Sequence, residues 1–277
     1  MNPVNPVVSV CIPAYNAEAH LEGLIEAVIG QSFADWELII VNNASTDSTA
    51  AVLEKILALH PDPRIKVITN DYTLKMVDNF NAAIGHATGE FIKLICADDL
   101  PTKDCLERQV LALRKYADVV MTAGSRIIIN NQGKRLFRRS GIKKTGIYDG
   151  KKMIRRCILA GTNIIGDPVC VMWRRSAVQK LGAFDDSILY CFDMEYWLRI
   201  LNLGNLYYDA TPVGFYRIHK KSAGTGMAGI AVNDIVNAAK LQAMRGSVEL
   251  SSMDLRMVRF NAWWTGRLRQ LVYKILG

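Results

Sequence analysis

The segment that decides the fold is Phe91-Ile92-Lys93-Leu94-Ile95-Cys96-Ala97-Asp98-Asp99-Leu100. Its apolar run predicts a buried strand, which ends abruptly in two adjacent carboxylates. Polar groups just beyond the carboxyl end of a central strand are where an open α/β sheet usually builds its ligand site. Two neighbouring acids at that place suit a hard cation such as Mg²⁺ or Mn²⁺. The alternative is that Asp98 and Asp99 only cap a helix that starts near Pro101.

Strands and helices alternate around this segment, over the first hundred residues. The expected strands are residues 7–12, 37–41, 65–69 and 91–96, the first of them stopped by Pro13. The expected helices between them are residues 18–29, about 47–59 and 76–87. This alternation predicts an α/β fold with a mostly parallel, Rossmann-like central sheet, right-handed crossovers and helices on both faces.

The rest of the chain is expected to mix shorter strands with helices. The expected helices are residues 103–115, 150–159, 176–181 and 192–203, and the expected strands are 119–122, 127–129, 169–173, 206–208 and 213–216. The turn residues Asn130-Asn131-Gln132-Gly133 suggest a hairpin. Residues from Ile230 onward are expected to be wholly helical, which adds a helical C-terminal segment to the fold.

Composition indicates a folded globular protein. The chain has 277 residues, half of them apolar, so it can bury a sizeable core and disorder is excluded. We expect no signal peptide, and no window of about 20 residues is apolar enough to span a bilayer. The cysteines include no C-x-x-C pair, which favours buried reduced thiols in a cytoplasmic protein over disulfides or a zinc site. The six are Cys11, Cys96, Cys105, Cys157, Cys170 and Cys191.

The net charge of +8 is concentrated in two regions. Lys134 to Arg156 contains ten basic residues against one acid, and Leu255 to Gly277 contains five against none. Such concentrations point to an anionic partner, namely membrane lipid, a polyanionic substrate or nucleic acid, although a solvated surface is the alternative. Nucleic acid is disfavoured because the basic residues are not interleaved with aromatic residues in a recognised module.

The common nucleotide and hydrolase motifs are missing from the sequence. It contains no G-x-G-x-x-G after the first strand, no G-x-x-x-x-G-K-[ST] and no G-x-S-x-G. Polar residues follow three strands instead, in the segments 13–16, 42–43 and 98–99. If these strand ends converge, an aromatic ring, amides and carboxylates could stack a base, bind its edge and hold a metal on phosphates. Tyr15 taken alone would more often be a core or turn residue.

Several segments occur in the order found in a known enzyme family. Over about residues 7 to 219, the sequence resembles a family 2 glycosyltransferase of the GT-A fold. The matching segments are Val8-Ser9-Val10-Cys11-Ile12-Pro13-Ala14-Tyr15-Asn16, Gln31-Ser32-Phe33, Trp36 to Asp47, Asn79-Phe80-Asn81, Ala87-Thr88-Gly89-Glu90-Phe91-Ile92, Ala97-Asp98-Asp99, Gly182-Ala183-Phe184-Asp185, Asp193 to Arg199 and Tyr216-Arg217-Ile218-His219.

The resemblance implies how a nucleotide-diphosphate-sugar donor would be bound. Asp98 would bind a divalent metal, Mg²⁺ or Mn²⁺, that bridges the donor diphosphate, and Asp99 would support that site or contact the sugar. His219 could contact the donor phosphates or ligate the metal, although a lone His is more often incidental. The residues expected to line the base are Pro13, Ala14 and Tyr15, with Asn42 hydrogen-bonding its edge.

The resemblance also implies an inverting mechanism, with Asp193 as the general base that removes a proton from the acceptor hydroxyl. The alternative for Asp193 is an N-terminal helix residue favoured by the helix dipole. Three positions depart from the family pattern. Asn42 and Cys96 each stand where the family commonly has an acid, and Phe80 stands where many members have Arg, so a phosphate contact is missing or comes from Lys75.

The basic regions suggest where the acceptor could be. A C-terminal helix with arginines and Trp263-Trp264 can lie in a membrane interface, or it can pack on the domain or on a second subunit of a homo-oligomer. For a polyprenyl-diphosphate-linked glycan acceptor, Arg138 and Arg139 could face lipid headgroups or the acceptor diphosphate. The protein would then lie on the inner face of the plasma membrane and act in bacterial surface polysaccharide assembly.

We expect residues 1–225 to form the glycosyltransferase domain and 226–277 a C-terminal helical segment. Within the domain, residues 1–100 are the expected nucleotide-binding half and 101–225 the acceptor half. Two alternatives stay open. A sugar nucleotidyltransferase would also join an α/β sheet, a metal and a nucleotide, and a non-catalytic nucleotide-sugar-binding or membrane-assembly subunit is compatible with Asn42 and Cys96.

Overall fold

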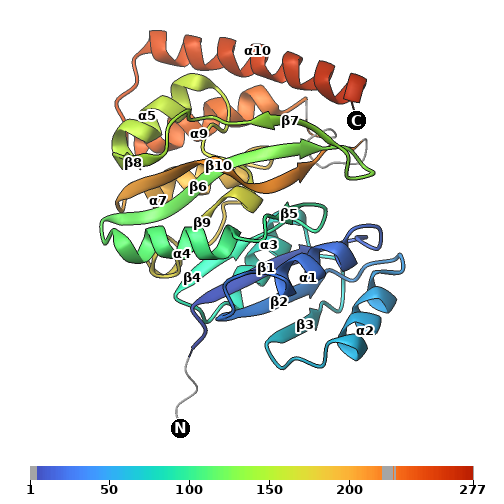
Figure 1. Cartoon of the computed structure of the whole chain (residues 1–277). Helices are drawn as coiled ribbons and strands as arrows, with labels where there is room; N and C mark the ends of the chain where they lie inside the picture. The colour runs from blue at the N-terminus through green and yellow to red at the C-terminus, as the bar shows by residue number, and fades with distance from the viewer. Residues whose placement is uncertain (1–4, 220–226, 228, 277) are drawn as a thin grey trace.

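The computed structural model describes residues 5–219, 227 and 229–276 (Figure 1). Its described strands form one ten-stranded sheet in the order β3-β2-β1-β4-β9-β6-β10-β5, with β7 paired to β6 and β8 paired to β10. Among the described residues, no helix is both long and apolar enough to cross a membrane. The predicted domain boundary between residues 225 and 226 lies outside the described residues.

The first half of the sheet is parallel, as the sequence predicted. β1 pairs with β2 on one side and with β4 on the other, and β3 extends the sheet beyond β2. The strands are β1 (Val8–Ala14), β2 (Trp36–Asn42), β3 (Ile65–Thr69) and β4 (Phe91–Leu94), and the helices between them are α1 (Leu21–Ile29), α2 (Thr49–Leu59) and α3 (Met76–Gly85). Every residue of β1 and β2 is buried, which is the environment of a central strand covered on both faces.

The second half of the sheet is mixed. β9 runs antiparallel between β4 and β6, whereas β6 and β10 are parallel to each other. The strands are β5 (Leu100–Pro101), β6 (Val119–Ile129), β7 (Arg135–Arg139), β8 (Gly146–Tyr148), β9 (Met172–Arg174) and β10 (Asn205–Arg217). The helices are α4 (Cys105–Lys115), α5 (Gly150–Ala160), the 3₁₀ turn η1 (Pro168–Cys170), α6 (Ser176–Leu181), α7 (Phe192–Leu201), α9 (Ala231–Met244) and α10 (Ser252–Leu276).

Several boundaries differ from the sequence predictions, the largest differences lying in the second half of the chain. β6 and β10 are each one long strand where two short ones were predicted, and β10 accommodates its turn-like residues through register shifts around Asp209 and Pro212. The predicted strand 169–173 begins instead as the 3₁₀ turn η1. The C-terminal helix is broken at residues 245–251, where Gly246 has φ +71°.

Pro13 does not stop the first strand. β1 continues through Pro13 to Ala14, both paired with β2. β4 pairs with β1 only as far as Cys11, opposite Leu94, so Pro13 has one neighbouring strand rather than two. A proline lacks the N–H that a strand with two neighbours needs, and this one-sided position tolerates it.

A buried polar network holds the central strands in register. Glu37 of β2 accepts hydrogen bonds from Ser9 Oγ of β1 (2.6 Å) and from the N–H and Oγ1 of Thr88 (2.9 and 2.7 Å). Ser9 Oγ also accepts from the N–H of Gly89, where an added Cβ would lie 2.7 Å from Ser9 N. Burial alone would raise the pKa of Glu37, but these bonds and Lys66 together lower it to about 2.

Lys93 interrupts the apolar run of β4 and is completely buried. Its Nζ donates to Gln109 Oε1 of α4 (2.9 Å) and to the carbonyl oxygen of Val169 (2.5 Å). The strand that leads to the two carboxylates is therefore tied to α4 and η1, and both contacts satisfy a group that would be costly to bury alone.

Candidate active site

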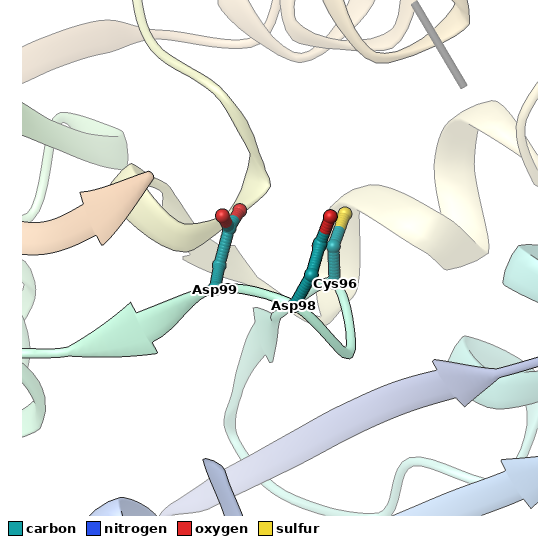
Figure 2. Close-up of side chains that lie close together, drawn as sticks. All are labelled: Cys96, Asp98 and Asp99. Carbon is teal, nitrogen blue, oxygen red and sulfur yellow. The ribbon is translucent and has the colours of Figure 1, made fainter. Parts of the chain in front are cut away.

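The two acids after β4 lie in a loop at the carboxyl end of the parallel strands (Figure 2). Ligand atoms of Cys96, Asp98 and Asp99 all lie within 4.8 Å of one another. Helix α4 begins only at Cys105, with Asp104 as the residue before it. The alternative that Asp98 and Asp99 cap a helix near Pro101 is therefore wrong, because Pro101 belongs to β5.

Asp99 is buried with one carboxylate oxygen unsatisfied. Its side chain is 1% exposed, and Oδ1 accepts a hydrogen bond from the N–H of Arg217 at 2.9 Å. Oδ2 accepts none from the residues that the structure describes. Burial and then the neighbouring charge of Asp98 raise the pKa of Asp99 well above its ordinary value. A buried carboxylate oxygen without a partner is the position that a cation would fill.

Asp98 is the more accessible of the two acids, with its side chain 32% exposed. Its Oδ2 lies 3.1 Å from Nε2 of His219, so the structure joins two residues that the sequence placed 121 positions apart. Arg217, at the end of β10, donates from Nε to the backbone oxygen of Asp98 at 2.8 Å. The ring of His20, before α1, lies 6.1 Å from that of His219, which sequence reasoning did not anticipate.

This donor set fits a hard divalent cation. Asp98 and Asp99 contribute carboxylate oxygens from one short loop, and one of those oxygens is orphaned. Mg²⁺ and Mn²⁺ prefer oxygen ligands, commonly one or two carboxylates together with substrate phosphates. Cys96 brings a thiol to the same point, where the family commonly has an acid, so the carboxylate content of the site is reduced.

The residues expected to line a nucleotide base cluster at the ends of β1 and β2. Tyr15 follows β1 and is 49% exposed, so it lies in the bend after the strand and not in the core. Pro13 and Ala14 are buried within β1. Asn42 ends β2 with 3% exposure, and its Oδ1 accepts from the N–H of Ser45 at 3.2 Å. Tyr15 is thus the one side chain of this group that projects to solvent beside the strand ends.

Asp193 lies in the first turn of α7, where both of its oxygens are engaged. Oδ1 accepts from the N–H of Met194 (2.7 Å) and Oδ2 from Nδ2 of Asn163 (3.0 Å). Burial, and secondarily the charge of Asp167, raise its pKa to about 7. A helix-dipole residue in a solvated first turn would have a low pKa, so the environment of Asp193 is that of a group able to exchange a proton near neutrality.

The charges of Asp98, Asp99, Asp167 and Asp193 all act on Cys96. Burial first, and then these four carboxylates, raise the pKa of the Cys96 thiol well above its ordinary value. The end of β4 and the start of α7 therefore share one electrostatic neighbourhood. This electrostatic coupling is the reason to treat the acids as one candidate site.

Sequence reasoning missed Asp167 and Asn163. Asp167 precedes η1, and its Oδ2 lies 2.5 Å from Nε of Arg126 in β6, a residue that is 3% exposed. Asn163 holds Asp193 as described above. The signal that could have pointed to them is the segment Gly161 to Pro168, in which turn-forming residues surround both polar side chains.

The remaining residues singled out from the sequence lie on β7 and α10 or fill an apolar cluster. Arg138 of β7 donates from Nε to Ser125 Oγ at 3.2 Å and from its guanidinium to the backbone oxygen of Ala210, while Arg139 is its neighbour on the same strand. Trp263 and Trp264 are exposed on α10. Phe80 packs edge-on against Phe192 with ring centroids 4.9 Å apart, so it fills an apolar cluster beside Asp193.

Known proteins resemble this chain in sequence and in fold. The chain is 34% identical over 220 residues to WfgD of Escherichia coli, a UDP-Glc:alpha-D-GlcNAc-diphosphoundecaprenol beta-1,3-glucosyltransferase, covering 78% of this chain and 79% of WfgD. The fold of this chain is similar to that of S. aureus TarS 1-349 in complex with UDP-GlcNAc, with a TM-score of 0.71 and 17% identity over 93% of this chain and 71% of that TarS fragment. The mannosyltransferase PcManGT from Pyrobaculum calidifontis, in complex with GDP-Man and Mn²⁺, gives a TM-score of 0.62 and 18% identity over 99% of this chain and 74% of PcManGT.

The described fold is therefore of the GT-A type, as the sequence resemblance implied. The family model named Glycosyl transferase family 2 matches residues 9–182, more than half of the chain. That span includes the ends of β1, β2 and β4 and the Asn163–Asp167 segment. The chain belongs to glycosyltransferase family 2.

Proposed function

We propose that this protein is an inverting, metal-dependent glycosyltransferase that moves a sugar from a nucleotide-diphosphate-sugar donor to a hydroxyl of a lipid-linked glycan. The observation that carries the proposal is the cluster of Cys96, Asp98 and Asp99, whose ligand atoms lie within 4.8 Å of one another and include an orphaned carboxylate oxygen. Asp193, whose pKa is raised to about 7, acts through its charge on Cys96 of the same cluster. Residues 1–100 would bind the donor, residues 101–225 the acceptor, and residues 226–277 would complete the acceptor side.

The donor would lie across the ends of β1, β2 and β4. Tyr15 can stack on a base, while Pro13, Ala14 and Asn42 form the strand ends beside it. Asp98 and Asp99 would hold Mg²⁺ or Mn²⁺, and a cation bound there would neutralise charge on the leaving nucleotide diphosphate. His219 would help to place the Asp98 carboxylate. The Mn²⁺ in the PcManGT complex supports this choice of ion.

Asp193 would act as the general base. Its carboxylate would accept the proton of the acceptor hydroxyl as the hydroxyl oxygen attacks the anomeric carbon. The bond to the diphosphate oxygen breaks on the opposite face, which inverts the anomeric configuration. A base works best when its pKa lies near the operating pH, and the value of about 7 at Asp193 meets that condition.

The acceptor class is suggested by relatives. WfgD is named for a diphosphoundecaprenol-linked acceptor, which supports a polyprenyl-diphosphate-linked glycan and a role in bacterial surface polysaccharide assembly. The proposal includes two donor nucleotides, UDP and GDP, because TarS was solved with UDP-GlcNAc and PcManGT with GDP-Man. On this proposal the protein works in the cytoplasm, at the inner face of the plasma membrane.

A thermal-shift screen of UDP and GDP, each with and without Mn²⁺, would test the donor site. A ligand that binds only the folded protein raises its melting temperature. We expect one diphosphate to raise it more with Mn²⁺ than without, and that dependence should vanish in Asp98→Asn. No shift with any nucleotide diphosphate would reject the donor site.

A non-catalytic binding subunit remains the second candidate, because Cys96 replaces an acid in the metal site. Incubation with the matching nucleotide sugar separates the two functions. Release of nucleotide diphosphate that depends on Asp193 supports the enzyme, whereas tight binding without turnover of any tested donor and acceptor supports the subunit.

A further inference from the structure

Helix α10 carries an exposed apolar stripe on the side away from its packed face. The packed face includes Val258 and Ala262, which are 0% and 1% exposed. Six large apolar residues recur every three or four positions, so they fall on one side of the helix. They are Met253 (70% exposed), Met257 (42%), Phe260 (61%), Trp264 (51%), Leu268 (46%) and Leu271 (55%).

Arginines form one edge of this stripe. Arg256, Arg259 and Arg267 are exposed, and the guanidinium of Arg267 lies 5.8 Å from the ring centre of Trp263. Residues 255–277 contain no acid, and Asp254 of α10 is paired with Arg155 of α5 at 3.1 Å. The neighbouring surface is basic as well, because α5 also exposes Lys151, Lys152 and Arg156.

We propose that α10 docks on an anionic lipid surface. Its apolar stripe would enter the boundary between headgroups and acyl chains, and its arginine edge and the exposed cations of α5 would lie against lipid phosphates. A second copy of this chain fits the same surface poorly. Two such helices packed together would bring arginines toward arginines, with no acid in residues 255–277 to pair with them.

The docked helix would be joined to the acceptor side of the site. Arg269 of α10 donates to Thr162 Oγ1 at 3.1 Å and also reaches the hydroxyl of Tyr190. Thr162 is next to Asn163, which holds Asp193. Figure 1 shows α10 lying over α5 and α9, at the end of the molecule away from β1, β2 and β3. The lipid contact itself does not depend on the proposed reaction.

Co-sedimentation of the full chain with vesicles would test the proposal, using phosphatidylcholine vesicles with and without about one third phosphatidylglycerol. The stripe variant carries Phe260→Ser and Trp264→Ser. The edge variant carries Arg256→Gln, Arg259→Gln and Arg267→Gln. Leu111→Ser on α4 is the matched control, because Leu111 is 61% exposed like Phe260 but lies on another face. All of these side chains are exposed, and unchanged melting temperatures verify folding.

We expect binding to anionic vesicles that falls about tenfold or more in either multiple variant and is unchanged in Leu111→Ser. Equal binding by the stripe variant and the wild type, or no binding by the wild type, would overturn the proposal. A wild-type dimer in light scattering that dissociates in the stripe variant, together with no vesicle binding, would assign the stripe to a second copy instead. The vesicles contain no sugar donor, so these outcomes are independent of whether the protein transfers sugar.

Discussion

Asn163 donates from Nδ2 to Oδ2 of Asp193 at 3.0 Å, with its amide orientation fixed by the backbone. Its Oδ1 accepts from the N–H groups of Ile165 and Gly166 at 3.1 and 3.0 Å, so Nδ2 must face the carboxylate. A donor held against a carboxylate favours the charged form. Asn163 therefore opposes the burial that raises the pKa of Asp193, and it acts as a positioning residue for that group.

Asn163→Asp should shift the pH profile of sugar transfer. Aspartate keeps an acceptor for Ile165 and Gly166, so the turn is preserved, while the donor to Asp193 is lost and a like charge is added. We expect the acidic limb of the profile of kcat/KM to move up by about one pH unit. Measurement of initial rates across pH 5 to 9 tests this, and an unmoved limb would show that Asn163 serves the turn alone.

Asp193→Asn should reduce kcat by about a hundredfold or more, because the amide cannot accept the acceptor proton. The wild-type rate should rise with pH as Asp193 loses its proton near pH 7 and then level off. Donor binding should survive, since Asp98 and Asp99 remain. Full activity in this variant would remove Asp193 from the role of base.

The pKa of Asp193 also predicts how stability depends on pH. The folded-state value of about 7 lies above the ordinary 3.8, so the protonated form is favoured in the folded protein. The protonated Asp193 therefore stabilises the folded protein fully below pH 3.8, and this stabilisation is lost as pH rises through 7. Relative to Asp193→Asn, the free energy of unfolding of the wild type should fall by about 3–4 kcal/mol between pH 4 and 7.5. Urea unfolding of both proteins at each pH gives the difference, and a flat difference would contradict the raised pKa.

Cys96→Asp should strengthen divalent cation binding. The thiol lies within 4.8 Å of ligand atoms of Asp98 and Asp99, so a carboxylate there adds a third oxygen donor for a hard cation. We expect Mn²⁺ affinity, measured by calorimetry with the nucleotide diphosphate present, to rise about tenfold. Cys96→Ser is the size-matched control and should change affinity little. Equal affinity in all three proteins would place the ion away from Cys96.

Glu37→Gln should destabilise the fold without touching the site. Glu37 has a folded-state pKa of about 2 against an ordinary 4.5, so its charged form is favoured in the folded protein. The charged Glu37 therefore stabilises the folded protein above pH 4.5, and this stabilisation is lost as pH falls toward 2. We expect the variant to lose about 1–3 kcal/mol of unfolding free energy at pH 7 and little near pH 2.5. A pH-independent difference would show that shape and not charge matters at Glu37.

The parallel half of the sheet could be predicted because its signals are local. Apolar strands alternate with amphipathic helices there, and β3 has the predicted bounds. The second half was less predictable because β6 and β10 are held by pairing across more than 80 residues. Turn-like residues around Pro212 therefore do not end β10. Long-range pairing overrides local propensity there.

The candidate site, too, could be predicted only where its signals are local. Asp98 and Asp99 follow an evident strand, and Asp193 lies within a family motif. The contacts that define their chemistry, from His219 to Asp98 and from Asn163 to Asp193, join distant segments and leave no pattern in the sequence. The Cys96 substitution was visible, but its distance of less than 4.8 Å from the ligand atoms of Asp98 and Asp99 was not.

Gly161 ends α5 with φ +61°, and an added Cβ would lie 2.5 Å from the backbone nitrogen of Ala262 in α10. No side chain fits between these two backbones. For protein engineering, this means that α5 and α10 have to be treated as a matched pair. A chimera with a relative should exchange α5 and Gly161 together with α10, since either one alone would meet a surface shaped for another partner.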